Sequence, residues 1–159
     1  MTRIQKEAKQ GDPTVQWSLG VLDARGNGVP QSFTEAVKWF RKSAEQGCAP
    51  GQEFLGHSYA LGQGVPQDHA EAVKWLQKAV LQGQATVAAY WALGLRYANG
   101  LGTPQNDGEA VKCFKVAAEQ DLGEAQAALG NIYAQGRGVP KDDLEASKWL
   151  LKAAAQGKV

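Results

Sequence analysis

The sequence predicts an all-α fold of about four helix-turn-helix repeats, preceded by half a repeat at the N-terminus. The first observation is a Leu-Gly pair that recurs as Leu19-Gly20, Leu55-Gly56, Leu93-Gly94 and Leu129-Gly130. The second is a Gly-x-Gly turn that begins at Gly26, Gly62, Gly100 and Gly136. The third is a Glu-Ala dipeptide that begins at Glu35, Glu71, Glu109 and Glu145. A fixed period of this kind is the signature of an array in which each copy packs on its neighbours.

These landmarks divide the chain into one partial and four full repeats, which together form a single solenoid domain. The predicted ranges are 1–11, 12–47, 48–83, 84–121 and 122–157. Residues 1–11 match the end of the second helix of a repeat, because Ala8, Gln10 and Gly11 align with Ala44, Gln46 and Gly47. Two interpretations stay open: this helix caps the first repeat, or the array is cut from a longer one.

The first helix of the first full repeat is predicted to begin at Asp12-Pro13 and to end near Arg25. Aspartate is a good N-cap residue, and proline fits the first turn of a helix. The turn that starts at Gly26 ends the helix, because glycine adopts the left-handed conformation and Pro30 blocks continuation.

The second helix of each repeat is predicted to begin with a capping box. The N-cap residues lie three positions before the glutamate of each Glu-Ala dipeptide, and they are Ser32, Asp68, Asn106 and Asp142. A glycine follows the predicted helix at Gly47, Gly83 and Gly157, whereas Asp121 occupies that position in the third repeat. The third repeat is also two residues longer, and the alignment places the insertion between Gln84 and Tyr90.

The last helix has no predicted helix after it. Its apolar face, which includes Leu150 and Ala154, is therefore expected to be partly open. An open apolar face of this kind indicates self-association or a missing C-terminal piece.

Charge and hydropathy exclude several classes of protein. The chain has 17 basic and 16 acidic residues, and this near-neutral balance gives no electrostatic reason to expect nucleic acid or an anionic membrane as a partner. No apolar run is long enough for a membrane span. The polar N-terminus lacks a signal peptide, so the chain as written is expected to be cytoplasmic; a removed signal would make it periplasmic or secreted.

No catalytic, metal or cofactor site is predicted. Cys48 and Cys113 belong to distant repeats, too far apart for a disulfide, so both are expected to be free thiols. No neighbouring Cys or His has zinc-ligand spacing, so neither cysteine is expected to bind a metal ion. His57 and His69 have no third partner for catalysis or metal binding. The Gly-x-Gly turns join two helices and lack the lysine of a phosphate-binding loop. A lysine row at Lys38, Lys74, Lys112 and Lys148 indicates a solvated face with weak ion pairs.

The residues that recur in each repeat resemble the Sel-one-like repeat family, a branch of the tetratricopeptide-type α/α solenoids. The residues that carry the resemblance are the Leu-Gly pair, the tyrosine after it, the Gly-x-Gly-Val turn, Glu-Ala-x-x-Trp and a closing Gln-Gly. It covers residues 12–157, with departures at Asp23, which replaces the tyrosine, and Thr103, which replaces the valine. The resemblance implies a right-handed α/α superhelix that serves as an adaptor in protein complexes, and many bacterial members are exported or act in envelope signalling.

One side of the first helices is the candidate partner-binding surface. At 3.6 residues per turn, the positions two before, two after and five after the leucine of each Leu-Gly pair fall opposite the core. The resemblance places this side in a concave groove. The candidate binding residues are Trp17, Val21, Glu53, His57, Trp91, Leu95 and Asn131.

A groove with this mixture of side chains suits a peptide or a partner helix. The leading hypothesis is therefore a non-enzymatic scaffold that binds another protein. In a second interpretation the tryptophans only pack against the adjacent first helix. The functional alternatives are a structural or self-associating array, a segment of a longer envelope-signalling or secreted protein, and an enzyme or small-ligand binder, for which no polar cluster is present.

Overall fold

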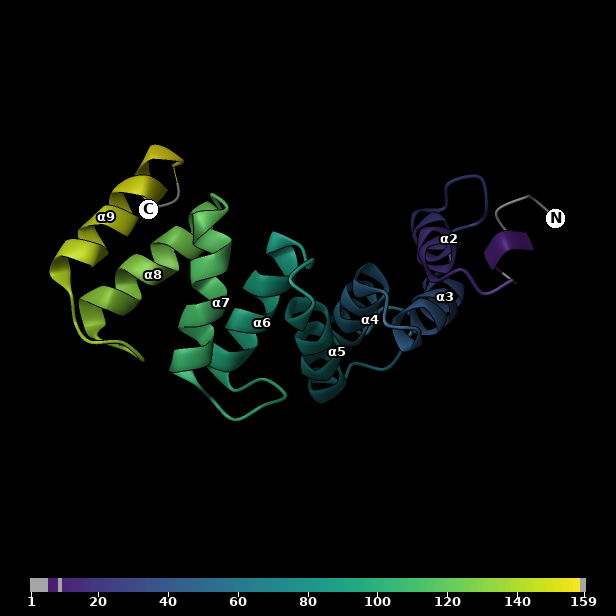
Figure 1. Cartoon of the computed structure of the whole chain (residues 1–159), viewed down its shortest axis with the longest axis horizontal. Coiled ribbons are helices and arrows are strands. Elements are labelled where there is room, and N and C mark those ends of the chain that lie inside the picture. Colours follow the sequence, from purple (N-terminus) through teal and green to yellow (C-terminus); the bar gives the residue numbers. More distant parts are fainter. Residues whose placement is uncertain (1–5, 9, 158–159) are drawn as a thin grey trace. The chain divides into compact units, whose positions relative to one another are not determined.

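The structure is a computed structural model that describes residues 6–8 and 10–157. Among these residues every regular element is helical and none is a strand, which confirms the predicted all-α class. The chain forms two compact units, Met1–Ala85 and Thr86–Val159, and within each unit the helices follow one another in pairs (Figure 1). Of the predicted N-terminal half repeat, residues 6–8 are helical and Ala8 is buried, while residues 1–5 and 9 lie outside the described part.

From Pro13 to Ala155 the structure contains two helix pairs in each unit. The helices of the first unit are α2 (Pro13–Arg25), α3 (Phe33–Glu45), α4 (Ala49–Leu61) and α5 (His69–Leu81). Those of the second unit are α6 (Val87–Asn99), α7 (Asp107–Glu119), α8 (Gly123–Gln135) and α9 (Asp143–Ala155).

The first helix of each pair ends at the glycine predicted from the sequence. α2 begins after Asp12, whose carboxylate accepts hydrogen bonds from the backbone N–H groups of Thr14 and Val15 at 2.8 and 3.1 Å. It ends at Gly26, whose φ of 71° lies in the left-handed region that only glycine adopts at low cost. The equivalent glycines end α4, α6 and α8 in the same conformation, and they are Gly62, Gly100 and Gly136.

The second helix of each pair begins at the predicted N-cap. The cap side chain accepts a hydrogen bond from the N–H of the glutamate three residues later, at 3.0 Å from Asp142 to Glu145. The N–H of Asp142 donates to the carbonyl oxygen of Tyr133 in the first helix of the same pair, at 3.0 Å. The other three caps repeat both bonds. The N-cap is therefore confirmed. In a full capping box the glutamate side chain would accept from the cap N–H, but here that N–H donates to the first helix and joins the two helices.

A glycine in the first helix lets the two helices of a pair touch. A Cβ added to Gly94 would lie 2.6 Å from Cε1 of Phe114, and one added to Gly20 would lie 2.6 Å from Cε1 of Phe40. Carbon atoms in favourable contact are about 3.5–4.0 Å apart, so no larger side chain fits unless the ring moves. Gly56 and Gly130 meet a leucine of the second helix in the same way. The recurring Leu-Gly pair is therefore a packing requirement.

Buried glutamines, which the sequence analysis did not predict, join successive repeats within each unit. Nε2 of Gln126 donates to the carbonyl oxygen of Ala118 in the preceding repeat at 3.2 Å, and its Oε1 accepts from Nε2 of Gln156 in its own repeat at 3.0 Å. Gln52 bonds to Ala44 and Gln82 in the same manner. Gln16 bonds to the carbonyl oxygen of Ala8, so the N-terminal turn stands where a preceding repeat would be. Each of these glutamines both donates and accepts a side-chain hydrogen bond, as expected for a buried amide.

The third repeat lacks this glutamine and has Tyr90 in its place. Its first helix, α6, begins after Thr86, whose hydroxyl accepts a hydrogen bond from the N–H of Ala89 at 3.4 Å. The two extra residues lie in the loop before this helix, within the predicted segment from Gln84 to Tyr90. Asp121, which replaces the helix-terminal glycine, has a φ of 62°.

Replacing Gly94 with alanine should reduce the free energy of unfolding by about 1–3 kcal/mol, because the new methyl group overlaps the Phe114 ring. Gly108, in the first turn of α7, is a matched control, because the atom nearest an added Cβ is Oδ1 of Asn106 at 3.4 Å. There the same substitution should raise stability by up to about 1 kcal/mol. Urea denaturation followed by circular dichroism measures both. Equal effects at the two positions would contradict the packing requirement.

Candidate functional site

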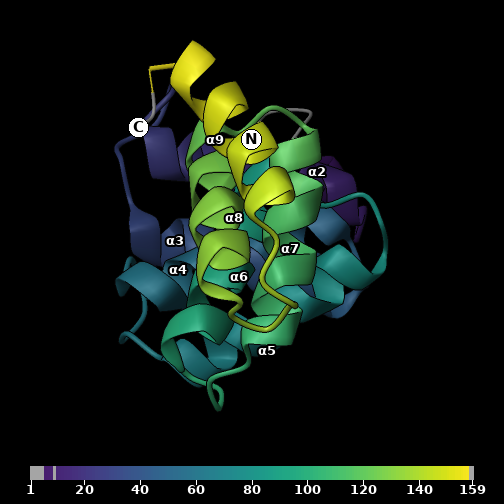
Figure 2. The ribbon, with the colours of Figure 1, turned by 90° about the vertical axis from the view of Figure 1, so that its left-hand side faces the viewer.

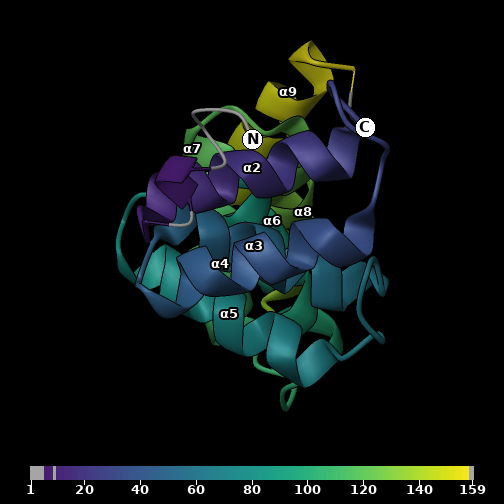
Figure 3. The same ribbon diagram turned by 90° about the vertical axis from the view of Figure 1, so that its right-hand side faces the viewer.

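The first unit contains a slot between α2 and α4. Figure 3 shows the backbone of these two helices and of α3 beside them. Val21 and Ala24 line it from α2, Phe54 and His57 line it from α4, and the buried Phe40 of α3 lies between them. Its volume is about 340 Å³, at the small end of the range of ligand sites. We call it the first slot.

The second unit contains the same slot between α6 and α8. Leu95 and Ala98 stand where Val21 and Ala24 stand in the first slot, and Phe114 of α7 replaces Phe40, each 74 positions later in the sequence. The volume of this second slot is about 430 Å³. The slot is therefore a product of the repeat, since it forms wherever a pair of first helices lies over the aromatic ring of a second helix.

One residue accounts for the main difference between the slots. In the first slot Phe54 packs between Phe40, at a ring-centroid distance of 5.1 Å, and Trp17, at 6.0 Å. In the second slot the position of Phe54 is Ala128. Trp91 there packs directly on Phe114 at 5.1 Å and lines the slot. The small alanine leaves open the space that Phe54 fills in the first slot.

The rims of the slots also differ in polarity. The second slot is edged by the amide side chains of Asn99, Asn131 and Gln135 and by an ion pair, in which Nη2 of Arg137 lies 2.8 Å from Oδ1 of Asp107. Gly138 allows this ion pair, because its backbone lies so close to Asp107 that an added Cβ would meet Cβ of Asp107 at 2.8 Å. The first slot has Arg25, His57 and Gln63 at equivalent positions of its rim.

Five of the seven predicted binding residues line the slots. Val21 and His57 line the first slot, and Trp91, Leu95 and Asn131 line the second. The other two have different surroundings. Trp17 packs edge-on against Phe54, and its indole N–H is buried with no hydrogen-bond partner among the described residues.

Glu53 is buried, with 5% of its surface exposed, and its Oε1 lies 3.7 Å from Nε2 of His57. It is therefore not presented on the surface as a polar contact for a partner. Trp17 thus matches the interpretation in which the tryptophans only pack against the adjacent first helix. Trp91 lines a slot, so for this residue the interpretation as a partner contact stays open.

Three features of the slots were not predicted from the sequence: Phe54, Ala128 and the Asp107–Arg137 ion pair. Phe54 and Ala128 occupy one column, immediately before the Leu-Gly pair of their repeats. Comparing that column between the repeats that follow those of Trp17 and Trp91 would have shown which tryptophan has room beside it. The ion pair was harder to foresee, because its members lie 30 residues apart in successive repeats.

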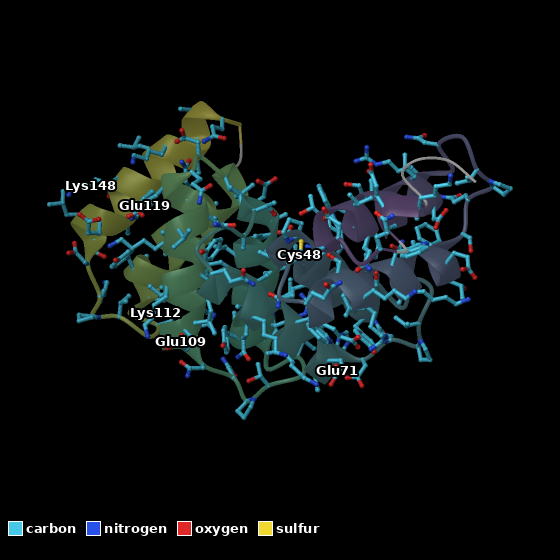
Figure 4. All side chains as sticks on the ribbon, turned by 45° about the vertical axis from the view of Figure 1, so that its right-hand side comes forward. Cys48, Glu71, Glu109, Lys112, Glu119 and Lys148 are labelled. Carbon is cyan, nitrogen blue, oxygen red and sulfur yellow. The ribbon has the colours of Figure 1, made fainter. Side chains whose placement is uncertain are left out.

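Charged residues on the second helices pair with one another rather than forming a polyanion site. Nζ of Lys112 lies 2.5 Å from Oε1 of Glu109, and Figure 4 labels these two side chains. Lys38, Lys74 and Lys148 pair with the glutamates three residues before them. These pairs are largely exposed, so each contributes little to stability.

Two further kinds of site are absent from the described residues. In that part of the chain no three His, Cys, Asp or Glu side chains come together as metal ligands do. None of its helices combines the length and apolarity that crossing a membrane requires.

The model of the Sel1 repeat matches the chain four times, at residues 13–48, 49–84, 87–122 and 123–158. The chain belongs to the Sel1 repeat family. Sel1 repeat proteins are generally non-catalytic scaffolds for protein–protein interaction. No curated protein matches this chain.

Several solved structures are similar to the Sel1 repeats of this chain. The structure of c5321, a protective antigen present in uropathogenic Escherichia coli strains, has 40% sequence identity and a TM-score of 0.87. A Sel1 repeat protein from Oxalobacter formigenes has 34% identity and a TM-score of 0.84. Both likenesses cover 98% of this chain, but only 33% of the first and 63% of the second protein. The chain therefore spans less than two thirds of these relatives.

The two cysteines should differ strongly in reactivity. Both are free, but Cys113 is buried in place of the repeat tryptophan, and burial raises the pKa of its thiol to about 11. Because this pKa lies about three units above pH 8, well under 1% of the thiol is ionised at that pH. The ionised thiolate is the reactive form. Iodoacetamide labelling followed by mass spectrometry should modify the half-buried Cys48 at least about tenfold faster than Cys113. Equal rates would contradict the assignment of Cys113 to the core.

Proposed function

We propose that this Sel1 repeat chain is a non-enzymatic protein-interaction scaffold whose slots between adjacent first helices bind apolar side chains of a peptide or partner helix. The presence of the slot in both units is the main observation that supports the proposal. The same apolar walls and aromatic base recur in two units, although the rim residues differ. A slot built by the repeat recurs with each copy, and its recurrence gives the chain two similar anchor sites with different rims.

The second slot is the stronger candidate for an anchor site. Trp91 and Leu95 offer partly exposed apolar surface beside the buried Phe114 ring. Tryptophan is enriched among the residues that dominate binding energy at protein interfaces. Burying one leucine-sized or aromatic side chain of a partner there would contribute about 1.5–3 kcal/mol.

The rim of the second slot suits the backbone of a peptide. The amide side chains of Asn131 and Gln135 both donate and accept hydrogen bonds, as peptide groups require. The ion pair of Arg137 with Asp107 keeps the rim nearly neutral, which favours an apolar anchor without a strong preference for charged flanking residues. A partner with one bulky apolar side chain between polar residues fits this chemistry.

Filling the second slot should weaken binding without unfolding the chain. Ala128→Phe places in the second slot the phenylalanine that the first slot already accommodates as Phe54. Peptides enriched from a random display library on the immobilised chain should bind this variant at least about tenfold more weakly, the loss of one buried anchor. Trp91→Ala should weaken the same peptides.

Leu81→Ser is the matched control, because Leu81 is 84% exposed and lies outside both slots. It should leave affinity unchanged. Circular dichroism of all three variants should show the helical spectrum of the wild-type chain. Peptides that bind Ala128→Phe as tightly as the wild type would reject the second slot as the site.

A further inference from the structure

In the first slot the chain places one of its own aromatic rings between two others. The centroid of the Phe54 ring lies 5.1 Å from that of Phe40 and 6.0 Å from that of Trp17. Phe40 is buried at the base of the slot, whereas Phe54 is half-buried and reaches the surface. The first slot therefore shows which kind of side chain fits between the phenylalanine and the tryptophan of this repeat architecture.

The second slot has the same two flanking residues but lacks the ring between them. Trp91 and Phe114 stand in the columns of the flanking tryptophan and phenylalanine, and Ala128 stands in the column of the missing ring. All three line the slot, whose volume is about 430 Å³, compared with about 340 Å³ for the first slot. Figure 2 shows the ribbons of α6, α7 and α8, the helices that carry these three residues.

The place of the missing ring can be reached from solvent. Ala128 and Trp91 are half-buried, and Asn131 and Gln135, one and two turns further along α8, are exposed. A side chain of a partner can therefore enter beside Ala128 without any helix moving. There it would contact Trp91 and Phe114 together, because these two rings pack against each other with centroids 5.1 Å apart.

The surroundings of this place favour an aromatic side chain over an aliphatic one. In the first slot the Phe54 ring meets Trp17 edge-on at an interplanar angle of 60° and meets Phe40 tilted at 40°. Such arrangements bring the positive edge of one ring to the negative face of another, and this attraction adds to the burial of apolar area. A leucine in the same place would bury apolar area but would lack the attraction between rings.

The rim of the second slot is polar where that of the first slot is apolar. Asp107 and Gln135 stand in the columns of Phe33 and Leu61, which are 38% and 64% exposed. The aromatic base and the polar rim together match a single ring flanked by amide groups. Phenylalanine and tyrosine residues within a peptide have this chemistry.

We infer that the second slot selects an aromatic side chain, phenylalanine or tyrosine, in a partner's peptide, and that its ring takes the place that Phe54 takes in the first slot. This inference rests on the proposed function and narrows its anchor from apolar to aromatic. In the first slot the equivalent place is already filled, so the two slots differ in what they accept.

Titration with three blocked amino acids tests the inference. The probes are N-acetylphenylalaninamide, N-acetylleucinamide and N-acetylcyclohexylalaninamide, whose saturated ring is as large as phenyl but has no π-system. The readout is the NMR signal of the Trp91 indole N–H, assigned with a Trp91→Phe variant. The phenylalanine probe should shift this signal with a Kd in the millimolar range, as expected for so small a ligand. It should bind about threefold to tenfold more tightly than either other probe, the preference that attraction between rings gives.

Two variants show where the probe binds. Ala128→Phe should abolish the response of Trp91, because the new ring occupies the place of the ligand. Leu81→Ser, outside both slots, should leave it unchanged. Equal affinity for the leucine or cyclohexylalanine probe would overturn the inference but leave the proposed function standing. No response of Trp91 to any probe would count against both.

The reciprocal variant opens the first slot. Phe54→Ala removes the chain's own ring, so the phenylalanine probe should then shift the indole N–H signal of Trp17 as well as that of Trp91. Circular dichroism establishes that this variant is folded, and the titration of the wild-type chain decides the inference independently of it. A folded Phe54→Ala chain in which Trp17 does not respond would contradict the role assigned to the missing ring.

Discussion

In each helix pair of this Sel1 repeat chain, the second helix packs so closely on a glycine of the first helix that no side chain fits at that position. Carbon atoms of Phe40, Leu76, Phe114 and Leu150 occupy the space where the glycine Cβ would be. The close approach aligns the carbonyl of residue 133 with the N–H of Asp142, and the equivalent groups in the other pairs. It also fixes the Phe114 ring against which Trp91 packs, so the shape of the second slot follows from the contact at Gly94.

The periodicity of the sequence was enough to predict the helix pairs, because the features that end and begin helices are local. Gly26 and Asp142 act through their own backbone and neighbours within a few residues, and both have the predicted roles. The glutamines that join repeats were not predicted, since a buried Gln126 depends on an acceptor, Ala118, that only the folded chain brings near. Polar residues in an amphipathic pattern ordinarily indicate solvent.

The candidate site could be predicted in position but not in shape. Helical geometry identified the side of the first helices to which Leu95 and Asn131 belong. Whether a tryptophan on that side lines an opening depends on the volume of its neighbour on the next first helix, which is Phe54 for Trp17. No single helix contains that information.

A double-mutant cycle between Gly94 and Phe114 tests the closing contact most directly. Gly94→Ala and Phe114→Ala should each destabilise the chain, the first by overlap with the ring and the second by leaving a cavity. In the double variant the new methyl group occupies space that the ring has vacated. The loss in unfolding free energy measured in urea should therefore be smaller than the sum of the single losses by at least about 1 kcal/mol. Strict additivity would show that the glycine and the ring do not compete for the same space, and would contradict the account.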